Sequence, residues 1–302
     1  MKEPVIELRL WRQFLAVAEE LHFGRAAARL HMTQPPLTQA VAQLERLLGV
    51  RLFDRTKRSV RLTAAGDALV APARELLARA QSLPEQARAA AAGEVGRLRI
   101  AFVSTVGFAL LPQWVRAFRA QHPQVSLELI EATGDVQLKQ FARGEIDAGF
   151  MLHSPGFVPA GFSHLRIARE PLVLALPESH PLAHTARLQL NAVLREPLVI
   201  FPRRIVPSLH DAVFGMYHAA GRMPALAQEA IQMQTIVNLV SAGLGLAWVP
   251  DSVRQFQRPG VVYRQLGGRQ AQAVPWCETS LVWGTESPPL QRFTAFAKAQ
   301  LR

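Results

Sequence analysis

The chain has 302 residues, of which 49% are hydrophobic and 19% charged, and its formal net charge is +11 at pH 7. This length and composition predict two or three globular units and exclude a disordered polypeptide. Its apolar runs are far shorter than the roughly 20 residues that span a bilayer. The first residues include Glu3 and Glu7 instead of a basic and then apolar leader, so we expect a cytoplasmic protein with no membrane partner.

The single cysteine and the distribution of charge limit the kinds of site that the chain can form. The single cysteine, Cys277, excludes an internal disulfide and a zinc site, so we expect a small buried side chain there. Residues 1–66 hold 11 Lys and Arg against 6 Asp and Glu, residues 67–92 hold 3 against 3, and residues 93–302 hold 20 against 14. The dense positive charge of the first segment suits a phosphate-facing surface, although basic surfaces also serve solubility alone.

Three helices are predicted near the start of the chain. Apolar residues recur every three or four positions from Glu7 to Leu21, and residues 25–30 form a short Ala-rich helical segment. Thr33 offers an N-cap to a third helix that begins at Gln34-Pro35-Pro36 and runs to about Leu48. Its inner stripe is apolar, whereas its outer side is neutral and hydrogen-bonding.

A basic hairpin follows this third helix. Gly49 ends the helix, and residues 51–53 and 60–62 read as two short strands around a polar turn. The turn carries Arg55, Lys57 and Arg58. Three close helices followed by a basic hairpin are typical of a winged helix-turn-helix, in which one helix enters the major groove and the hairpin approaches the backbone. We therefore predict an all-α winged helix-turn-helix DNA-binding domain over residues 1–63.

Residues 64–92 are rich in Ala, Leu and Arg and predict one long helix. Its apolar stripe needs a partner surface, so we expect a linker helix that dimerises with a second copy. Pro72 and Pro84 are expected to bend it, because a proline inside a helix removes a hydrogen bond.

Beyond Gly93 to Gly96 the pattern becomes α/β, and residues 93–302 predict a domain of two α/β lobes with a cleft between them. The alternation of strands and helices favours a mainly parallel sheet flanked by helices. The expected strands are 98–103, 125–131, 146–151, 165–169, 171–176 and 198–201, and the expected helices are 110–121, 136–143, 209–220 and 232–242.

The N-terminal motifs resemble the DNA-binding domain of LysR-type transcriptional regulators. The residues that carry this resemblance are Phe14-Leu15-Ala16-Val17-Ala18-Glu19-Glu20, Phe23, Ala26-Ala27, Leu30, Gln34-Pro35-Pro36-Leu37, Leu44-Glu45, Leu48-Gly49-Val50, Leu52-Phe53-Asp54-Arg55 and Leu62-Thr63-Ala64-Ala65-Gly66. The resemblance implies a homodimer or homotetramer on double-stranded promoter DNA with an inverted repeat. It also implies a two-lobed effector domain like the type 2 periplasmic binding proteins, in which a small-molecule inducer shifts the oligomer between DNA-bound shapes.

Carried onto this sequence, the resemblance places the base-reading positions at Gln34, Pro35, Thr38 and Gln39, whose side chains suit hydrogen bonds to base edges and contact with a thymine methyl. Many family members have an arginine where Gln39 stands, so we expect this chain to read a different base there. The cations at 55, 57 and 58 would hold phosphates or enter the minor groove. The alternatives are a solvated helix face and a solvated charged turn.

An effector site is expected where strands end, because open α/β sheets bind ligands at the carboxyl ends of their strands. Hydroxyls and helix amides there would suit an anion, with a carboxylate as the expected class. Arg203 and Arg204 follow a strand at the cleft edge, where a guanidinium could grip a carboxylate or sulfonate in two places. The alternatives are that the hydroxyls only cap a helix and that the arginines lie on an exposed loop. The candidate ligand-binding residues are Ser104, Thr105, Thr133, Phe201, Pro202, Arg203, Arg204 and Thr235.

Two other functions compete with this reading. An α/β enzyme would need a nucleophile, metal or nucleotide pattern, and the sequence has no Gly-Lys-Ser/Thr loop, no G-x-S-x-G and no H-E-x-x-H. We therefore expect no catalytic residue, no metal and no cofactor. The second competitor is a DNA-binding regulator whose C-terminal domain senses nothing.

Overall fold

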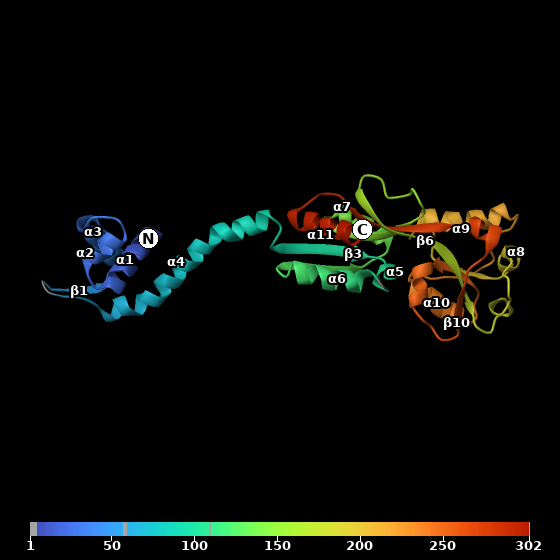
Figure 1. The fold of residues 1–302 in the computed structure, drawn as a ribbon, viewed down its shortest axis with the longest axis horizontal. Coiled ribbons are helices and arrows are strands. Elements are labelled where there is room, and N and C mark those ends of the chain that lie inside the picture. Colours follow the sequence, from blue (N-terminus) through green and yellow to red (C-terminus); the bar gives the residue numbers. More distant parts are fainter. Residues whose placement is uncertain (1–4, 57–58, 109, 302) are drawn as a thin grey trace. The chain divides into compact units, whose positions relative to one another are not determined.

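The computed structural model describes residues 5–56, 59–108 and 110–301. It divides into two compact units, one ending at Arg88 and one beginning at Ala89 (Figure 1). No helix in these described ranges is both long enough and apolar enough to cross a membrane.

The N-terminal unit contains three short helices, a two-stranded hairpin and one long helix. Helix α3 has the predicted bounds, and the left-handed Gly49 ends it as expected, at φ 70°. Thr33 occupies the N-cap position of α3, but its side chain makes no capping hydrogen bond. The elements are α1 (Leu8–Glu20), α2 (Phe23–Arg29), α3 (Gln34–Leu48), β1 (Phe53–Arg55), β2 (Val60–Leu62) and α4 (Ala64–Ala91).

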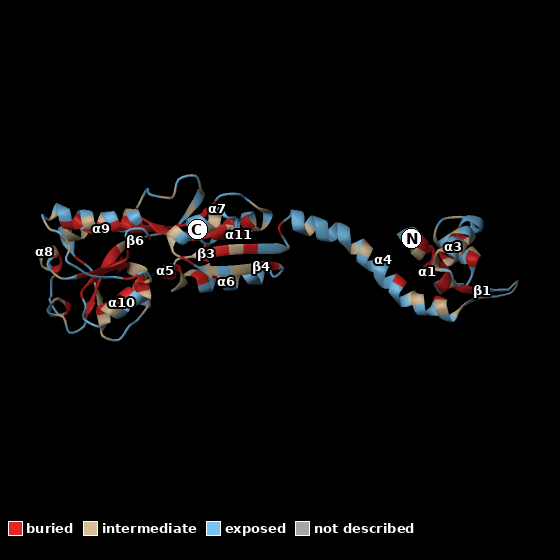
Figure 2. Cartoon of the chain, turned by 180° about the vertical axis from the view of Figure 1, so that it is seen from behind, coloured by how far each residue is buried: buried red, intermediate tan, exposed pale blue. Residues whose placement is uncertain are grey.

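The three short helices enclose one apolar core. Phe14, Leu37, Val41 and Leu44 are fully buried in it, and Phe53 of the hairpin joins them. Figure 2 shows the buried residues on the inward sides of these helices. The hydrophobic periodicity of the sequence therefore defines the core-facing side of α3.

Helix α4 starts against the hairpin and continues through both of its prolines. The hydroxyl of Thr63 donates to the carbonyl of Arg51 at 2.7 Å and accepts from the amide of Gly66 at 3.0 Å, which caps the helix. A Cβ on Gly66 would lie 2.2 Å from the carbonyl oxygen of Leu52, so only glycine allows this approach. Pro72 and Pro84 both lie inside the helix.

The C-terminal unit has a mixed sheet, so the expectation of a mainly parallel sheet is wrong. Strand β3 pairs in parallel with β4 and β5, whereas β6 and β11 pair with their neighbours in antiparallel fashion. The strands are β3 (Gly96–Phe102), β4 (Val125–Glu131), β5 (Ala148–His153), β6 (Ser163–Pro177), β7 (Leu198–Ile200), β8 (Leu226–Glu229), β9 (Ala247–Pro250), β10 (Val261–Arg264) and β11 (Trp276–Trp283). The helices are α5 (Ser104–Gly107), α6 (Leu110–Gln121), α7 (Gly134–Ala142), α8 (Leu190–Val193), α9 (Pro207–Ala219), α10 (Met233–Ser241) and α11 (Pro288–Gln300), with 3-10 turns at Pro181–Ala183, Asp251–Gln255 and Gly268–Ala273.

Two separate apolar cores define two lobes, and two long strands connect them. Ile167 of β6 and Leu281 of β11 lie in the first core, whereas Leu172 of β6 and Cys277 of β11 lie in the second. The two strands expected at 165–169 and 171–176 are one continuous strand, β6, which passes from the first core into the second. The two lobes are therefore joined through β6 and β11.

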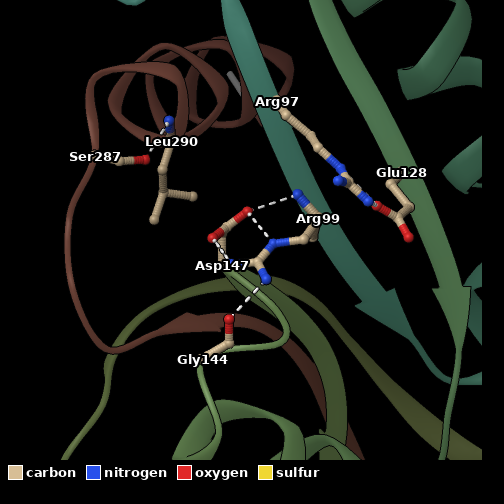
Figure 3. Close-up of polar contacts among 7 residues, drawn as sticks. All are labelled: Arg97, Arg99, Glu128, Gly144, Asp147, Ser287 and Leu290. Atoms are coloured by element: carbon tan, nitrogen blue, oxygen red, sulfur yellow. Dashed lines mark hydrogen bonds and ion pairs between the residues drawn. The ribbon is translucent and has the colours of Figure 1, made fainter.

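A polar cluster fixes the outer end of the first lobe. Arg99 of β3 faces Asp147, the residue before β5, with its Nη2 2.7 Å from Oδ1, and the Arg99 amide donates to Oδ2 at 2.7 Å (Figure 3). The same guanidinium reaches the carbonyl of Gly144 at 2.6 Å. Arg97 pairs with Glu128 on the neighbouring strand β4 (Figure 3). These bonds fasten the parallel strands at the end away from the cleft.

Candidate DNA-binding surface and effector cleft

The outer side of α3 presents the four predicted base-reading residues. Gln34, Pro35 and Gln39 are exposed, and Thr38 is half-buried. The Thr38 hydroxyl donates to the carbonyl of Gln34 at 3.1 Å, so its oxygen can still accept a hydrogen bond. Pro35 and Gln39 lie opposite the buried stripe of the same helix, whereas Gln34 and Thr38 lie beside it.

The hairpin is attached to α3 by one carboxylate. Oε1 of Glu45 accepts hydrogen bonds from the amides of Leu52 at 2.9 Å and Phe53 at 3.2 Å, and Oε2 pairs with Nη2 of Arg55 at 3.1 Å. The guanidinium of Arg55 also lies 4.6 Å from the ring centroid of Phe23. Arg55, predicted to hold a phosphate, therefore already has two partners inside the unit.

The other cations near the hairpin are Lys57, Arg58, Arg51 and Arg61. Lys57 and Arg58 lie outside the described residues. Arg51 and Arg61 flank the same hairpin with exposed side chains that make no ion pair within the described part of the chain. Sequence reasoning did not name these two, although the alternation within β2 already points the side chain of residue 61 away from Val60 and Leu62.

A second carboxylate joins α4 to α1 and α2. Glu19 of α1 accepts from Nη2 of Arg74 at 2.8 Å and from Nη2 of Arg29 at 2.8 Å. The hydrogen bond from Arg74 is the main reason that the pKa of Glu19 is lowered; burial opposes it, and the hydrogen bond and charge of Arg29 lower the pKa further. The beginning of the long helix is thus held against the DNA-binding helices.

In the C-terminal unit, the ends of α5, α7 and α10 meet at a small cavity between the lobes. Its volume is about 40 Å³. Thr133 occupies the N-cap position of α7 and Gln232 that of α10, so the amide ends of two helices face this region. The cavity is lined by Val103, Ser104, Thr105, Ala132, Thr133, Leu152, Phe201, Ile205, Val206, Ile231, Gln232 and Met233.

The hydroxyls in this cavity are not equivalent. Oγ1 of Thr105 is buried and has no hydrogen-bond partner among the described residues. The Thr133 hydroxyl donates to Oδ1 of Asp135 at 2.6 Å, which leaves its oxygen able to accept. An unpartnered buried hydroxyl is costly, and a ligand that pairs with it would remove that cost.

A neighbouring cavity of about 130 Å³ shares three wall residues with the first, Leu152, Ile205 and Val206. Arg204 lies on its wall, together with His153 and Ser208. Within the described ranges, Arg204 has no hydrogen-bond or ion-pair partner.

Arg203, its neighbour in the sequence, is engaged elsewhere. Its Nε and Nη2 both contact the carboxylate of Asp211 on α9, at 2.7 Å each. This pairing, led by the hydrogen bond from Arg203, lowers the pKa of Asp211.

The structure therefore brings Ser104, Thr105, Thr133 and Phe201 together around one cavity, with Arg204 on the next. Three predicted ligand residues line neither cavity: Pro202, Arg203 and Thr235. Sequence reasoning missed Gln232, because it placed the contact with α10 at Thr235 instead of at the N-cap. The apolar wall was also missed, because Ile205 and Val206 belong to no regular element that a periodic pattern would reveal.

His153 lies buried at the end of β5 with both ring nitrogens bonded. Nδ1 is 2.8 Å from the carbonyl of Ser154, to which it donates, and Nε2 is 2.9 Å from the hydroxyl of Ser280, from which it accepts. These roles belong to the neutral ring. Burial is the main reason that the pKa of His153 is lowered.

The strand crossing between the lobes carries a buried carboxyl and the buried cysteine. Glu170 accepts from the amide of Ser252 and from its hydroxyl at 3.0 Å. Burial raises the pKa of Glu170, and burial with the charge of Glu170 raises the pKa of Cys277. Cys277 is buried, as predicted.

Comparison with known proteins assigns the two units. Residues 8–67 match the bacterial regulatory helix-turn-helix protein, lysR family, and residues 91–302 match the LysR substrate binding domain. The chain is 44% identical to the HTH-type transcriptional regulator IlvR of Caulobacter vibrioides over 289 residues, which is 95% of each chain. It is 39% identical to the HTH-type transcriptional regulator AlsR of Bacillus subtilis over 269 residues, 89% of this chain and 88% of that one.

Solved structures give the same assignment. Full-length CbnR complexed with its target DNA covers 98% of this chain and 100% of its own, with a TM-score of 0.81 and 31% identity. A further crystal structure of CbnR, a LysR family transcriptional regulator, gives a TM-score of 0.76 and 32% identity over 97% of this chain and 100% of its own. The chain thus belongs to the LysR family of DNA-binding transcriptional regulators, with a helix-turn-helix domain followed by an effector-binding domain.

Proposed function

We propose that this regulator binds promoter DNA through α3 and the hairpin, and that a small carboxylate in the interlobe cleft controls it. The observation that supports the sensor is the buried, unpartnered Thr105 hydroxyl beside the N-caps of α7 and α10. The wall is mostly apolar with a few hydroxyls, which suits a carboxylate on an apolar body. The proposed domains are 1–63, 64–92 and 93–302, and the proposed assembly is a homodimer or homotetramer joined through α4, where Leu76 and Leu83 are exposed.

The cleft must open for such a ligand, because its cavity of about 40 Å³ is smaller than typical ligand sites of roughly 300 Å³ or more. The lobes are joined by the two strands β6 and β11, so a change in their angle is the natural way to open it. The hydroxyl and amide of Ser154 bond Ser208 of α9 at 2.9 and 3.1 Å, and these bonds hold the closed edge.

A thermal-shift screen of small carboxylates on the full chain tests the sensor. Stabilisation by one acid, weakened about tenfold in affinity by Ser104→Ala or Thr133→Val, supports the proposed site. Ser163→Ala, an exposed serine on β6, is the matched control and should not change the affinity. If no acid stabilises the protein, the C-terminal domain senses nothing, as in the second competing function. If the protein converts a stabilising acid into a product, the C-terminal domain is an enzyme.

Arg203 and Arg204 are expected to contribute differently to binding of the anion. We expect Arg204→Ala to lower the affinity for the carboxylate ligand, because Arg204 lines the second cavity and has no partner in the described part of the chain. We expect Arg203→Ala to matter less, since Asp211 holds Arg203. Unchanged affinity in both variants would end the proposal that a guanidinium holds the anion.

DNA reading is tested with fluorescence anisotropy on half-site variants. Gln39→Ala should flatten the base preference at one position by about 1–3 kcal/mol, whereas Gln86→Ala on α4 should leave it unchanged. A preference that survives Gln39→Ala would remove Gln39 from the readout. Affinity of wild type for its upstream DNA should fall steeply with salt, because Lys and Arg contacts to phosphates release counterions.

A further inference from the structure

The second lobe contains a positively charged pocket that the proposed function does not use. It lies between residues 186–189 and 264–270 and has a volume of about 560 Å³. Three arginines line it, Arg187, Arg264 and Arg269, and no Asp or Glu is among its lining residues. It shares no residue with either cavity of the interlobe cleft.

The walls of this pocket are fastened to each other. Arg264 at the end of β10 donates to the carbonyls of Ala183 and Thr185, the latter at 2.8 Å. Nε2 of Gln270 donates to Oε1 of Gln189 at 2.7 Å, which ties the two loops across the pocket. The pocket therefore needs little reorganisation before it binds a ligand.

Buried leucines anchor both loops from below. Leu188 and Leu266 are 5% and 6% exposed and belong to the core of the second lobe. The charged side chains of the two loops are thus displayed on a fixed base.

None of the three guanidinium groups pairs with a carboxylate in the described part of the chain, and the bonds of Arg264 go to neutral carbonyls. Arg187 and Arg269 are exposed, and neither side chain makes a hydrogen bond or ion pair in the described ranges. One acid, Asp251, contacts the pocket wall by accepting from Gln265 at 3.3 Å, and it is already paired with Arg254 at 2.6 Å. Like charges that converge on one concave site repel each other, and a bound anion turns that repulsion into attraction.

We propose that this pocket binds a compact polyanion, namely a small molecule carrying a phosphate or pyrophosphate group. Guanidinium groups match phosphate oxygens in pairs, and three of them supply more positive charge than a single carboxylate neutralises. A pocket of this size, closed by two tied loops, suits a small molecule better than the extended backbone of a duplex. The protein would then have a second ligand site, chemically different from the cleft.

Isothermal titration of the full chain with inorganic pyrophosphate tests this proposal, with ionic strength held constant by NaCl so that screening does not change. We expect saturable binding to one site per chain. The double variant Arg187→Ala with Arg269→Ala should lower the affinity about tenfold or more. Arg264 is not mutated, because it bonds the carbonyls of Ala183 and Thr185 and so holds one wall of the pocket. Arg258→Ala, an exposed arginine of the same lobe outside the pocket, is the matched control and should bind like wild type.

Several outcomes would overturn the proposal. One is the absence of saturable heat beyond the NaCl baseline, and another is an equal loss in the Arg258→Ala control, which would indicate diffuse charge. A loss caused by Thr133→Val would show that pyrophosphate uses the cleft instead. If the double variant weakens duplex DNA binding while pyrophosphate does not bind, the surface contacts nucleic acid and not a small polyanion.

Discussion

Replacing Glu45 with alanine tests whether one carboxylate positions the DNA-binding hairpin. The change removes the acceptor for two amides, those of Leu52 and Phe53, which belong to residues 0% and 2% exposed. Hydrogen bonds to a charged group contribute about 1.5–3 kcal/mol each, so the two lost bonds should cost about 3 kcal/mol or more in local stability. Arg55 loses its ion pair in the same step. A cost of this size is a large part of the roughly 5–15 kcal/mol that stabilises a typical domain.

Amide hydrogen exchange across residues 51–55 is the direct assay, because faster exchange reports local opening of the hairpin. Asp54→Ala is the matched control, since it removes the same charge from an exposed residue of the hairpin strand β1. Both variants should gain affinity for DNA from the lost negative charge, but only Glu45→Ala should also lose hairpin protection and sequence selectivity. Equal exchange rates and equal selectivity in the two variants would refute the clamp.

Three further changes probe other parts of the fold. Gly66→Ala should destabilise the N-terminal unit by about 1–3 kcal/mol, because the added Cβ would meet the carbonyl of Leu52. Gly215→Ala is the control and should not destabilise the protein, because the space around Gly215 is open. Equal melting temperatures of the two variants would contradict this prediction. Asp147→Ala should lower the free energy of unfolding by about 2 kcal/mol through the loss of its bonds to Arg99, and urea unfolding that matches wild type would show that water replaces them. The lowered pKa of His153 stabilises the fold above its unfolded pKa near 6.5, and this contribution is lost as pH falls through the folded pKa. Between pH 7.5 and 5.5 the free energy of unfolding, measured with urea, should therefore fall more for wild type than for His153→Gln. An equal fall in both proteins would contradict the prediction that His153 is neutral in the folded state.

The elements that depend on local pattern were predictable from the sequence. Helix α3 has the predicted bounds because its apolar stripe and Gly49 are properties of neighbouring residues. The direction of the sheet was not predictable in this way. Strand β11 pairs Leu281 with Leu165 of β6 and with Phe150 of β5, partners more than a hundred residues earlier, and no local pattern specifies such a pairing.

The effector site shows the same division. The residues at strand and helix ends, Ser104 and Thr133, could be named because the carboxyl edge of a sheet follows from the order of strands and helices. The wall from Ile205 and Val206 depends on how the second lobe packs across the cleft. Gln232 was missed although the helix was predicted to begin there, because the sequence does not show that its first residue, and not its first turn, lines the cavity.

The arginines show what a sequence pattern omits. Arg55 and Arg203 were assigned to external anions, but Glu45 and Asp211 lie ten and eight residues away in the chain and hold them in the structure. A guanidinium already bound to a carboxylate must give up that partner before it can bind a ligand, so much of its attraction is already used. Arg204, Arg187 and Arg269 have no such partner in the described part of the chain, and their full charge is available to a ligand. The carboxylates within reach of each cation, more than its place in a motif, therefore decide which arginines can bind an anion.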